Sequence, residues 1–290
     1  MKKKSSNYSK KIETDLRNKT ILITGGAGSI GIILVNKLLE YPVKSIRVLD
    51  INEHALFNLK RSIKSSKLRL LLGNILDKER VEMAGNNVDI VFHLAAVKNI
   101  EISEFNPIET IDTNINGTVN MIKMSMRNHP ELFLNISTDK AVNSSTLYGA
   151  TKLLGERLTS WAGIHIPNTK FATIRIGNVI ESRGNVFEIW EEESLRKQSI
   201  SITHPDMERY FFHTNEAVDF ILECVPLVKT GEIFVPKMKS YKIKDLAKKY
   251  SKKSQIIGLR KGEKMKEMLL SNDELKHAAN KKNMWIIKND

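Results

Sequence analysis

A glycine-rich turn near the start of the chain restricts the possible folds more than any other feature. The apolar run Thr20-Ile-Leu-Ile-Thr24 leads into Gly25-Gly-Ala-Gly-Ser-Ile-Gly31, and residues 30–39 then have helical periodicity. Glycine allows a tight turn and lets backbone N–H groups at the helix start approach a pyrophosphate. Because strand, turn and helix occur in this order, we expect a dinucleotide site. Its contacts would come from Gly25, Gly28, Ser29, Ile30 and Gly31.

Strand-like and helical segments then alternate as far as residue 176. The expected strands are 20–24, 45–50, 68–72, 89–93, 132–136 and 171–176, and the further helices are 53–65, 108–128 and 147–162. Such alternation is typical of a Rossmann-like, doubly wound parallel sheet in the α/β class. We therefore expect residues 18–176 to form a dinucleotide-binding domain.

The two ends of the chain have a different pattern. Residues 1–17 are polar and rich in lysine, which predicts a basic tail or one peripheral helix. Residues 177–290 contain irregular segments punctuated by glycine and proline, and they predict a smaller C-terminal substrate-binding lobe. Strands from about 209–235 could return to the main sheet.

The composition narrows the class of protein. The formal net charge is +13, but the lysines are scattered, so a solvated surface is the simplest explanation and no nucleic-acid partner is expected. Contact with an acidic membrane surface or another anionic partner remains the alternative. The sequence contains no run of about 18 apolar residues, so no membrane span is expected. The single cysteine, Cys224, excludes an intramolecular disulfide and a cysteine-based zinc cluster and fits a reducing cytoplasm; no metal site is expected.

Residues after the second and third strands bear on the choice of cofactor. Asp50 ends the second strand, where a carboxylate accepts hydrogen bonds from ribose hydroxyls and repels a 2′-phosphate. This favours NAD over NADP, although Arg47 and Lys60 are close enough in sequence to keep NADP open. Asn74 and Ile75 follow the third strand, where an adenine contact is expected.

A tyrosine and a lysine are spaced to share one helix face. Tyr148 and Lys152 stand at i and i+4, and a nearby ammonium favours phenolate, which could take a proton from a sugar hydroxyl. Lys152 could also hold the nicotinamide ribose. Thr138, at the preceding strand end, could bond the same hydroxyl. The spacing alone is common by chance, so the expectation depends on the glycine turn upstream.

Two ionisable residues follow Thr138 where a simple dehydrogenase needs none. Asp139 and Lys140 would suit an elimination from a hexose that has been oxidised at C4, because the C5 proton of the ketone is acidic. Lys140, if neutral, could remove that proton, and Asp139, if protonated, could expel the C6 hydroxyl. From the residues alone, an exposed acid–base pair at a strand end is an equally good explanation.

These residues resemble the signature of a known family. Ser137-Thr-Asp-Lys-Ala-Val-Asn143 followed by Leu147-Tyr-Gly-Ala-Thr-Lys152 is similar to the UDP-N-acetylglucosamine 4,6-dehydratases. These belong to the polysaccharide-biosynthesis branch of the extended short-chain dehydrogenases. The resemblance covers almost the whole chain from about residue 18, including the segments His93–Lys98, Thr203–Arg209, Gly231–Lys237 and Gly262–Lys264.

The resemblance implies roles that the residues alone do not. Asp139 would be the acid, Lys140 the C5 base and Tyr148 the C4-hydroxyl base, on UDP-N-acetylglucosamine. Lysine at position 140 points to the N-acetylhexosamine branch, and Tyr148 favours the soluble, C5-inverting type. Further cofactor contacts are implied for Ala95, Ala96 and Lys98, and substrate contacts for Lys98, Asn178, Arg183, Arg260 and Glu263. The resemblance also implies a homo-oligomer that pairs through the helices near 108–128 and 147–162.

Other functions remain open at this point. A UDP-sugar 4-epimerase or a C5-epimerising relative needs Tyr148 and Lys152 but has no obvious use for Asp139 and Lys140 together. A dehydrogenase that turns over free NAD(P) fits less well. A non-enzymatic nucleotide-sensing protein would be expected to lack a catalytic residue, and none is missing.

Overall fold

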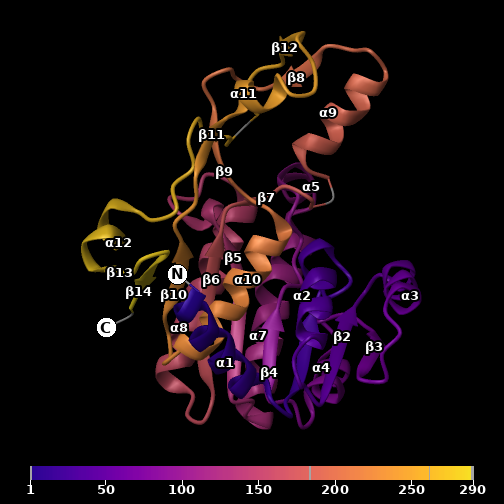
Figure 1. The fold of residues 1–290 in the computed structure, drawn as a ribbon, viewed down its shortest axis with the longest axis vertical. Helices are drawn as coiled ribbons and strands as arrows, with labels where there is room; N and C mark the ends of the chain where they lie inside the picture. The colour runs from indigo at the N-terminus through magenta and orange to yellow at the C-terminus, as the bar shows by residue number, and fades with distance from the viewer. Residues whose placement is uncertain (1, 183, 261, 289–290) are drawn as a thin grey trace.

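The computed structural model describes residues 2–182, 184–260 and 262–288 of the chain (Figure 1). Within this part, a large sheet carries helices on both faces, and a smaller lobe lies beyond one end of it, at the top of Figure 1. The lobe contains α9 (Val186–Leu195) and the short strands β8 (Ile200–Ile202) and β12 (Ser254–Ile256).

Nine strands of the described residues form the main sheet, in the order β13-β14-β10-β6-β5-β4-β1-β2-β3. From β10 to β3 all neighbours are parallel, whereas β14 is antiparallel to β10 and β13 is antiparallel to β14. Their bounds are β1 (Thr20–Thr24), β2 (Ser45–Asp50), β3 (Leu68–Leu72), β4 (Ile90–His93), β5 (Leu132–Thr138), β6 (Lys170–Ile176), β10 (Ile233–Pro236), β13 (Ala279–Asn280) and β14 (Met284–Ile287).

The strands expected from sequence are all present, and the parallel, doubly wound sheet is confirmed. Successive side chains of a strand point to opposite faces, so alternate residues enter two different cores. Ile21 and Ile23 pack with α2 and α10, whereas Leu22, between them, packs with α4 and α7. Burial on both faces explains why the central strands are apolar along their whole length.

Helices connect the strands and cover the sheet. Their bounds are α1 (Lys2–Leu16), α2 (Ser29–Leu39), α3 (Glu53–Ser62), α4 (Lys78–Gly85), α5 (Ile100–Phe105), α6 (Pro107–Ile111), α7 (Gly117–Asn128), α8 (Leu147–His165) and α10 (Thr214–Cys224), with short 3₁₀ turns η2 (Asp139–Ala141) and η3 (Val225–Leu227). The N-terminal segment forms α1, the peripheral-helix alternative, and its Ile12 and Leu16 are buried in the α2–α10 core.

One expected helix contains a local distortion. The segment 108–128 is helical throughout, as expected, but α6 and α7 are joined by a π-helical turn, η1 (Asp112–Asn116). In the π-helical turn, the Asn114 amide exchanges hydrogen bonds with both main-chain groups of Val97, at 2.8 and 2.9 Å. The π-helical turn thus coincides with a tertiary contact to a distant loop, and such turns often occur at functional sites.

The lobe is built from short elements. Strands β7 (Asn178–Val179), β9 (Glu208–Phe212) and β11 (Ser240–Lys242) form one small sheet, and β8 (Ile200–Ile202) and β12 (Ser254–Ile256) form another. Its helices are α9 (Val186–Leu195) and α11 (Ile243–Ala247), whereas α12 (Asn272–His277) lies beside β13 and β14 of the main sheet (Figure 1). Of the region expected to return to the main sheet, β10 does so and β9 does not. Among the described residues, no helix is long and apolar enough to cross a membrane.

Candidate active site

A cavity of about 780 Å³ lies between the carboxyl ends of the parallel strands and the lobe. Ligands of doubly wound sheets bind at this edge of the sheet. Every cofactor contact expected from sequence or resemblance lines the cavity: Gly25, Gly28, Ser29, Ile30, Gly31, Asp50, Asn74, Ile75, Ala95, Ala96, Lys98, Tyr148 and Lys152.

At two positions of the glycine turn the backbone is packed so closely that no side chain would fit. Gly25 has a φ of +66°, and a Cβ on it would lie 2.8 Å from the main-chain N and Cα of Ala95. A Cβ on Gly31 would lie 2.5 Å from the Cα of Gly26. The turn therefore brings bare backbone and the start of α2 to the cavity, an arrangement that fits the pyrophosphate of a dinucleotide.

Asp50 is fixed by the turn it faces. Its carboxylate accepts hydrogen bonds from the main-chain N–H groups of Ala27 and Asn52, both at 3.0 Å. Arg47, which together with Lys60 kept NADP open, donates instead to the carbonyls of Ala84 and Asn86. The cavity thus presents an oriented carboxylate where the adenosine ribose is expected, while the Arg47 guanidinium is already bound to main-chain carbonyls.

His93 at the end of β4 was not assigned a role from sequence. Its ring bonds the hydroxyl of Thr24 at 2.7 Å and that of Thr118 at 3.0 Å, and it is buried. Burial, and secondarily the charge of Lys152, lowers the pKa of His93 to about 3. The imidazole is therefore neutral, and its two hydrogen bonds connect β4 to β1 and to α7.

Tyr148 and Lys152 lie in the first turns of α8, where the expected helix begins. The Thr146 side chain caps this helix by accepting from the N–H of Gly149. Burial lowers the pKa of Lys152 to about 8, opposed by the charge of Glu156. Burial also raises the pKa of Tyr148, with a hydrogen bond to Thr138 acting in the opposite direction. Desolvation thus works against the phenolate expected from sequence, and the Thr138 hydrogen bond favours it.

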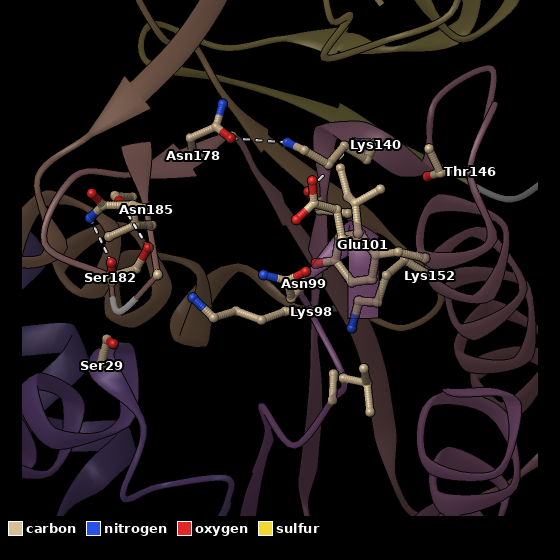
Figure 2. Close-up of a pocket in the computed structure, with 18 of the residues that line it drawn as sticks. Ser29, Lys98, Asn99, Glu101, Lys140, Thr146, Lys152, Asn178, Ser182 and Asn185 are labelled. Atoms are coloured by element: carbon tan, nitrogen blue, oxygen red, sulfur yellow. Dashed lines mark hydrogen bonds between the residues drawn. The ribbon is translucent and has the colours of Figure 1, made fainter. Parts of the chain in front are cut away.

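Asp139 and Lys140 form a close pair on η2. The Lys140 Nζ donates to Asp139 Oδ1 at 2.9 Å. It also donates to Asn178 Oδ1 at 3.0 Å, as Figure 2 shows. Lys140 lines the cavity, whereas Asp139 is completely buried beneath the lining. Its Oδ2 has no hydrogen-bond partner within the described part of the chain. The pair is therefore not the exposed acid–base pair considered above.

The lobe contributes charged side chains to the other end of the cavity. Arg260 pairs with Glu101 at 3.0 Å, and its main-chain N–H donates to Glu263 at 3.1 Å. Glu263 also pairs with Arg209 at 3.3 Å. Asn178, Arg260 and Glu263 are thus brought to one cavity, whereas Arg183 lies outside the described residues.

Sequence reasoning assigned no role to two cavity residues of this region. Arg209 and Glu267 line the cavity and are both more than nine-tenths buried. Arg209 belongs to the Thr203–Arg209 segment that carries the family resemblance, so a signal was present. Glu267 had no such signal, because only the fold turns it inward. Within the described residues, no cluster of three metal-ligating side chains is present.

A buried ion-pair network around Arg175, to which sequence reasoning also assigned no role, holds α8 in place. Arg175 of β6 is buried and bonds both carboxylate oxygens of Glu156 on α8, at 2.9 and 2.6 Å. It also bonds both oxygens of Glu274 on α12, at 2.9 and 2.8 Å. Ser137 of β5 donates to Glu156 at 2.6 Å. The network fixes the helix that carries Tyr148 and Lys152. A lone arginine in an apolar strand was its only sequence signal.

Comparison with known proteins identifies similar sequences over nearly the whole chain. Residues 21–289 match the family described as polysaccharide biosynthesis protein. An uncharacterized membrane protein of Methanocaldococcus jannaschii is 43% identical over 93% of this chain and 86% of its own. The UDP-N-acetylglucosamine 4,6-dehydratase (inverting) of Campylobacter jejuni is 37% identical over 88% of this chain and 78% of its own. A UDP-glucose 4-epimerase of Rickettsia bellii is 32% identical over 94% and 84%.

Solved structures share the fold. Pen from Bacillus thuringiensis superposes with a TM-score of 0.91 at 34% identity, covering 94% of this chain and 89% of that one. The dTDP-glucose 4,6-dehydratase DesIV from Streptomyces venezuelae, solved with NAD bound, has a TM-score of 0.80 at 19% identity, covering 89% of each chain. The second likeness concerns the fold alone.

Proposed function

The chain belongs to the polysaccharide biosynthesis protein family, and on that premise we propose that it is a UDP-N-acetylglucosamine 4,6-dehydratase that inverts C5. The proposed product is a UDP-4-keto-6-deoxy-N-acetylhexosamine, used in building a surface polysaccharide or glycan. One observation carries the proposal: the Lys140 amine, held by Asp139, lines the same cavity as Tyr148 and Lys152. A base for C5 thus lies beside the residues suited to oxidise C4.

Each catalytic residue has a distinct task in this reaction. Tyr148, assisted by the Thr138 hydroxyl and by Lys152, removes the proton of the C4 hydroxyl. The nicotinamide cofactor, when bound, supplies a reversible hydride acceptor. Once C4 is a ketone, Lys140 removes the acidified C5 proton. Asp139 is the proposed acid for the departing C6 hydroxyl, a role that requires its carboxyl group, buried behind Lys140, to reach the cavity when substrate binds. Elimination leaves a C5–C6 double bond, and the hydride taken from C4 then returns to C6 while a proton is delivered to C5. The overall change is therefore loss of one water without net oxidation.

The cofactor is proposed to be NAD. The Asp50 carboxylate is oriented by two main-chain N–H groups, and a 2′-phosphate beside it would be repelled. The side chain of Arg47, which could have compensated, bonds main-chain carbonyls instead. We also propose that the enzyme acts in the cytoplasm, where the buried free thiol of Cys224 stays reduced.

A UDP-sugar 4-epimerase is the second candidate, and the similar Rickettsia enzyme favours it. Epimerisation needs proton removal at C4 by Tyr148 and hydride return to the same carbon. It has no use for a base at C5. The close contact of Lys140 with Asp139 is therefore unexplained by this alternative, which is why the dehydratase is preferred.

The two candidates give different products from the same substrate. The protein is incubated with UDP-N-acetylglucosamine in D2O, without added cofactor, and followed by NMR. A dehydratase yields a C6 methyl signal and a 4-keto hydrate, with deuterium at C5. A galacto-configured product without deuterium would refute the dehydratase and support the epimerase. The Lys140→Ala variant should lose C5 exchange while retaining cofactor, and persistent exchange would refute Lys140 as the base.

We propose in addition that the enzyme is at least a dimer. Large apolar side chains are exposed on helices that pack together, α5, α6 and α8. Their exposed fractions are 83% for Phe105, 70% for Ile108, 57% for Ile164, 53% for Ile102 and 49% for Trp161. Monomeric proteins rarely leave such a group of side chains in water, and a second copy of this helical face would cover it.

A further inference from the structure

The side-chain amide of Asn178 is held at both ends by groups of the protein. Its Oδ1 accepts a hydrogen bond from Lys140 at 3.0 Å (Figure 2). Its Nδ2 donates to the carbonyl of Tyr210 at 2.9 Å. A carbonyl oxygen can only accept, so the Tyr210 contact decides which end of the amide faces Lys140. Strand pairing reinforces this orientation, because β7, which starts at Asn178, pairs with β9, which contains Tyr210.

Two acceptors of the protein hold the Lys140 amine. Asp139 Oδ1 lies 2.9 Å from Nζ and Asn178 Oδ1 lies 3.0 Å from it, and each accepts one hydrogen. An amine that acts as a base has two N–H groups and one lone pair. With both hydrogens directed to these acceptors, the lone pair would take the remaining direction, and Lys140 lines the cavity. The two acceptors would therefore orient the base as well as hold it.

We propose that Asn178 is a positioning residue for Lys140, setting the direction of its lone pair toward the sugar ring. This inference rests on the proposed dehydratase function. It differs from the role implied by the family resemblance, which places Asn178 on the UDP part of the substrate. In this chain both ends of the amide are turned to the protein, and the contact nearest the chemistry is with the C5 base.

Two variants of the full chain with its retained cofactor test the role. Asn178→Ala removes the acceptor, and Asn178→Asp keeps an oxygen there but adds a charge that stabilises the ammonium form of Lys140. Both should slow C5 deuterium exchange by on the order of tenfold to a hundredfold, as expected for a misdirected base. C4 oxidation, seen as transient absorbance of the reduced cofactor, should persist, and KM for UDP-N-acetylglucosamine should stay within about twofold of wild type.

A substrate-binding role for Asn178 would change KM instead of the rate of C5 exchange. KM would rise and UDP would bind more weakly, with C5 exchange unchanged at saturating substrate, and this result would overturn the proposal. Asn58→Ala is the control, since Asn58 is exposed on α3 and does not line the cavity. It should leave C4 oxidation, C5 exchange and KM as in wild type.

The same experiment separates failure of the inference from failure of the function. A wild-type protein that forms no C6-methyl product refutes the dehydratase itself. An active wild type whose Asn178 variants exchange C5 at the normal rate refutes only the positioning role. If Asn178→Ala loses its cofactor, the nearly isosteric Asn178→Asp variant tests the positioning role instead, through its rate of C5 exchange and its KM.

Discussion

At the scale of single residues, His93 links the chemistry of the site to the stability of the fold. Its neutral ring bonds Thr24 and Thr118 inside the sheet edge, and burial lowers its pKa to about 3. The folded state therefore disfavours protonation, whereas the unfolded chain accepts a proton near pH 6.5. Stability from this group is complete above pH 6.5 and is lost as the pH falls toward 3.

We predict that lowering the pH from 7 to 5 removes about 2 kcal/mol of unfolding free energy through His93, from the 1.36 kcal/mol per pH unit of linkage. Urea denaturation at the two pH values measures this. A His93→Gln variant should be less stable at pH 7 but lose less on acidification. Replacing the exposed His54 by glutamine is the control and should leave the acid dependence as in wild type. Equal acid sensitivity of wild type and His93→Gln would contradict the prediction.

Alanine substitutions at Gly25 and Gly258 would distinguish the cost of backbone strain from the cost of steric overlap. Both have positive φ, +66° and +85°, but a Cβ on Gly25 meets the Ala95 backbone at 2.8 Å, whereas one on Gly258 meets nothing within 4 Å. We predict that Gly258→Ala costs about 1 kcal/mol, from the left-handed conformation alone. Gly25→Ala should cost at least twice as much and should release the cofactor, as thermal unfolding and absorbance of the purified protein would show. Equal effects would mean that the overlap is relieved by backbone movement.

Most site residues could be predicted from sequence because they stand at strand ends or share one helix face. Gly25, Asp50 and Tyr148 all line the predicted cavity for this reason. His93 and Arg175 could not be assigned, because their partners lie on other elements, and one sequence does not show which elements will meet. The burial of Asp139 was left open, since an exposed acid–base pair at a strand end explained the sequence equally well.

At the scale of elements, the π-helical turn shows where periodicity loses its predictive value. The segment 108–128 has continuous helical periodicity, yet η1 interrupts it. Asn114 there bonds Val97 after β4 and the hydroxyl of Thr151, the neighbour of Lys152. The distortion thus connects the cofactor loop to α8. A tertiary contact of this kind outweighs local helix preference and leaves no trace in the pattern.

Helix α12 has only six residues and depends on Arg175. Glu274 completes a capping box with Ser271 and also bonds the Arg175 guanidinium. We predict that Glu274→Ala lowers the free energy of unfolding by about 2 to 3 kcal/mol, since it removes charged hydrogen bonds from a partly buried group. On the same helix, Asp273 pairs with Lys276 in solvent, so Asp273→Ala should cost no more than about 1 kcal/mol. Similar losses in both variants, measured in urea, would rule out a special role for the Arg175 network.

At the scale of the whole molecule, the order of strands and helices predicted the parallel part of the sheet but not the two antiparallel strands, β14 and β13, at its edge. The parallel strands β1 to β6 follow from alternating segments of predictable length. The strands β13 and β14 lie in a region of irregular pattern, and their antiparallel pairing depends on a return of the chain from the lobe. Short strands with long connections leave little periodicity to recognise.

The proposed dimer makes a prediction that belongs to the assembled molecule. Charges placed on the exposed face of α8, in the double variant Trp161→Glu with Ile164→Lys, should give a monomer by light scattering after size exclusion. Wild type should elute with at least twice that mass. Leu195→Glu is the control, because Leu195 is 78% exposed on α9 of the lobe, and should leave the mass unchanged. A monomeric wild type would refute the dimer without affecting the proposed chemistry.

The position of β14 in the sheet also has a consequence for the order of folding. β14 pairs with β10, and the chain between them, residues 237–283, passes through the lobe. The strand pair cannot form until that long loop has closed, which carries an entropic cost before any contact is gained. Pairings between distant parts of a chain form slowly. The edge at β10 is therefore expected to stay unpaired late in refolding, when it is the part of the sheet most exposed to aggregation.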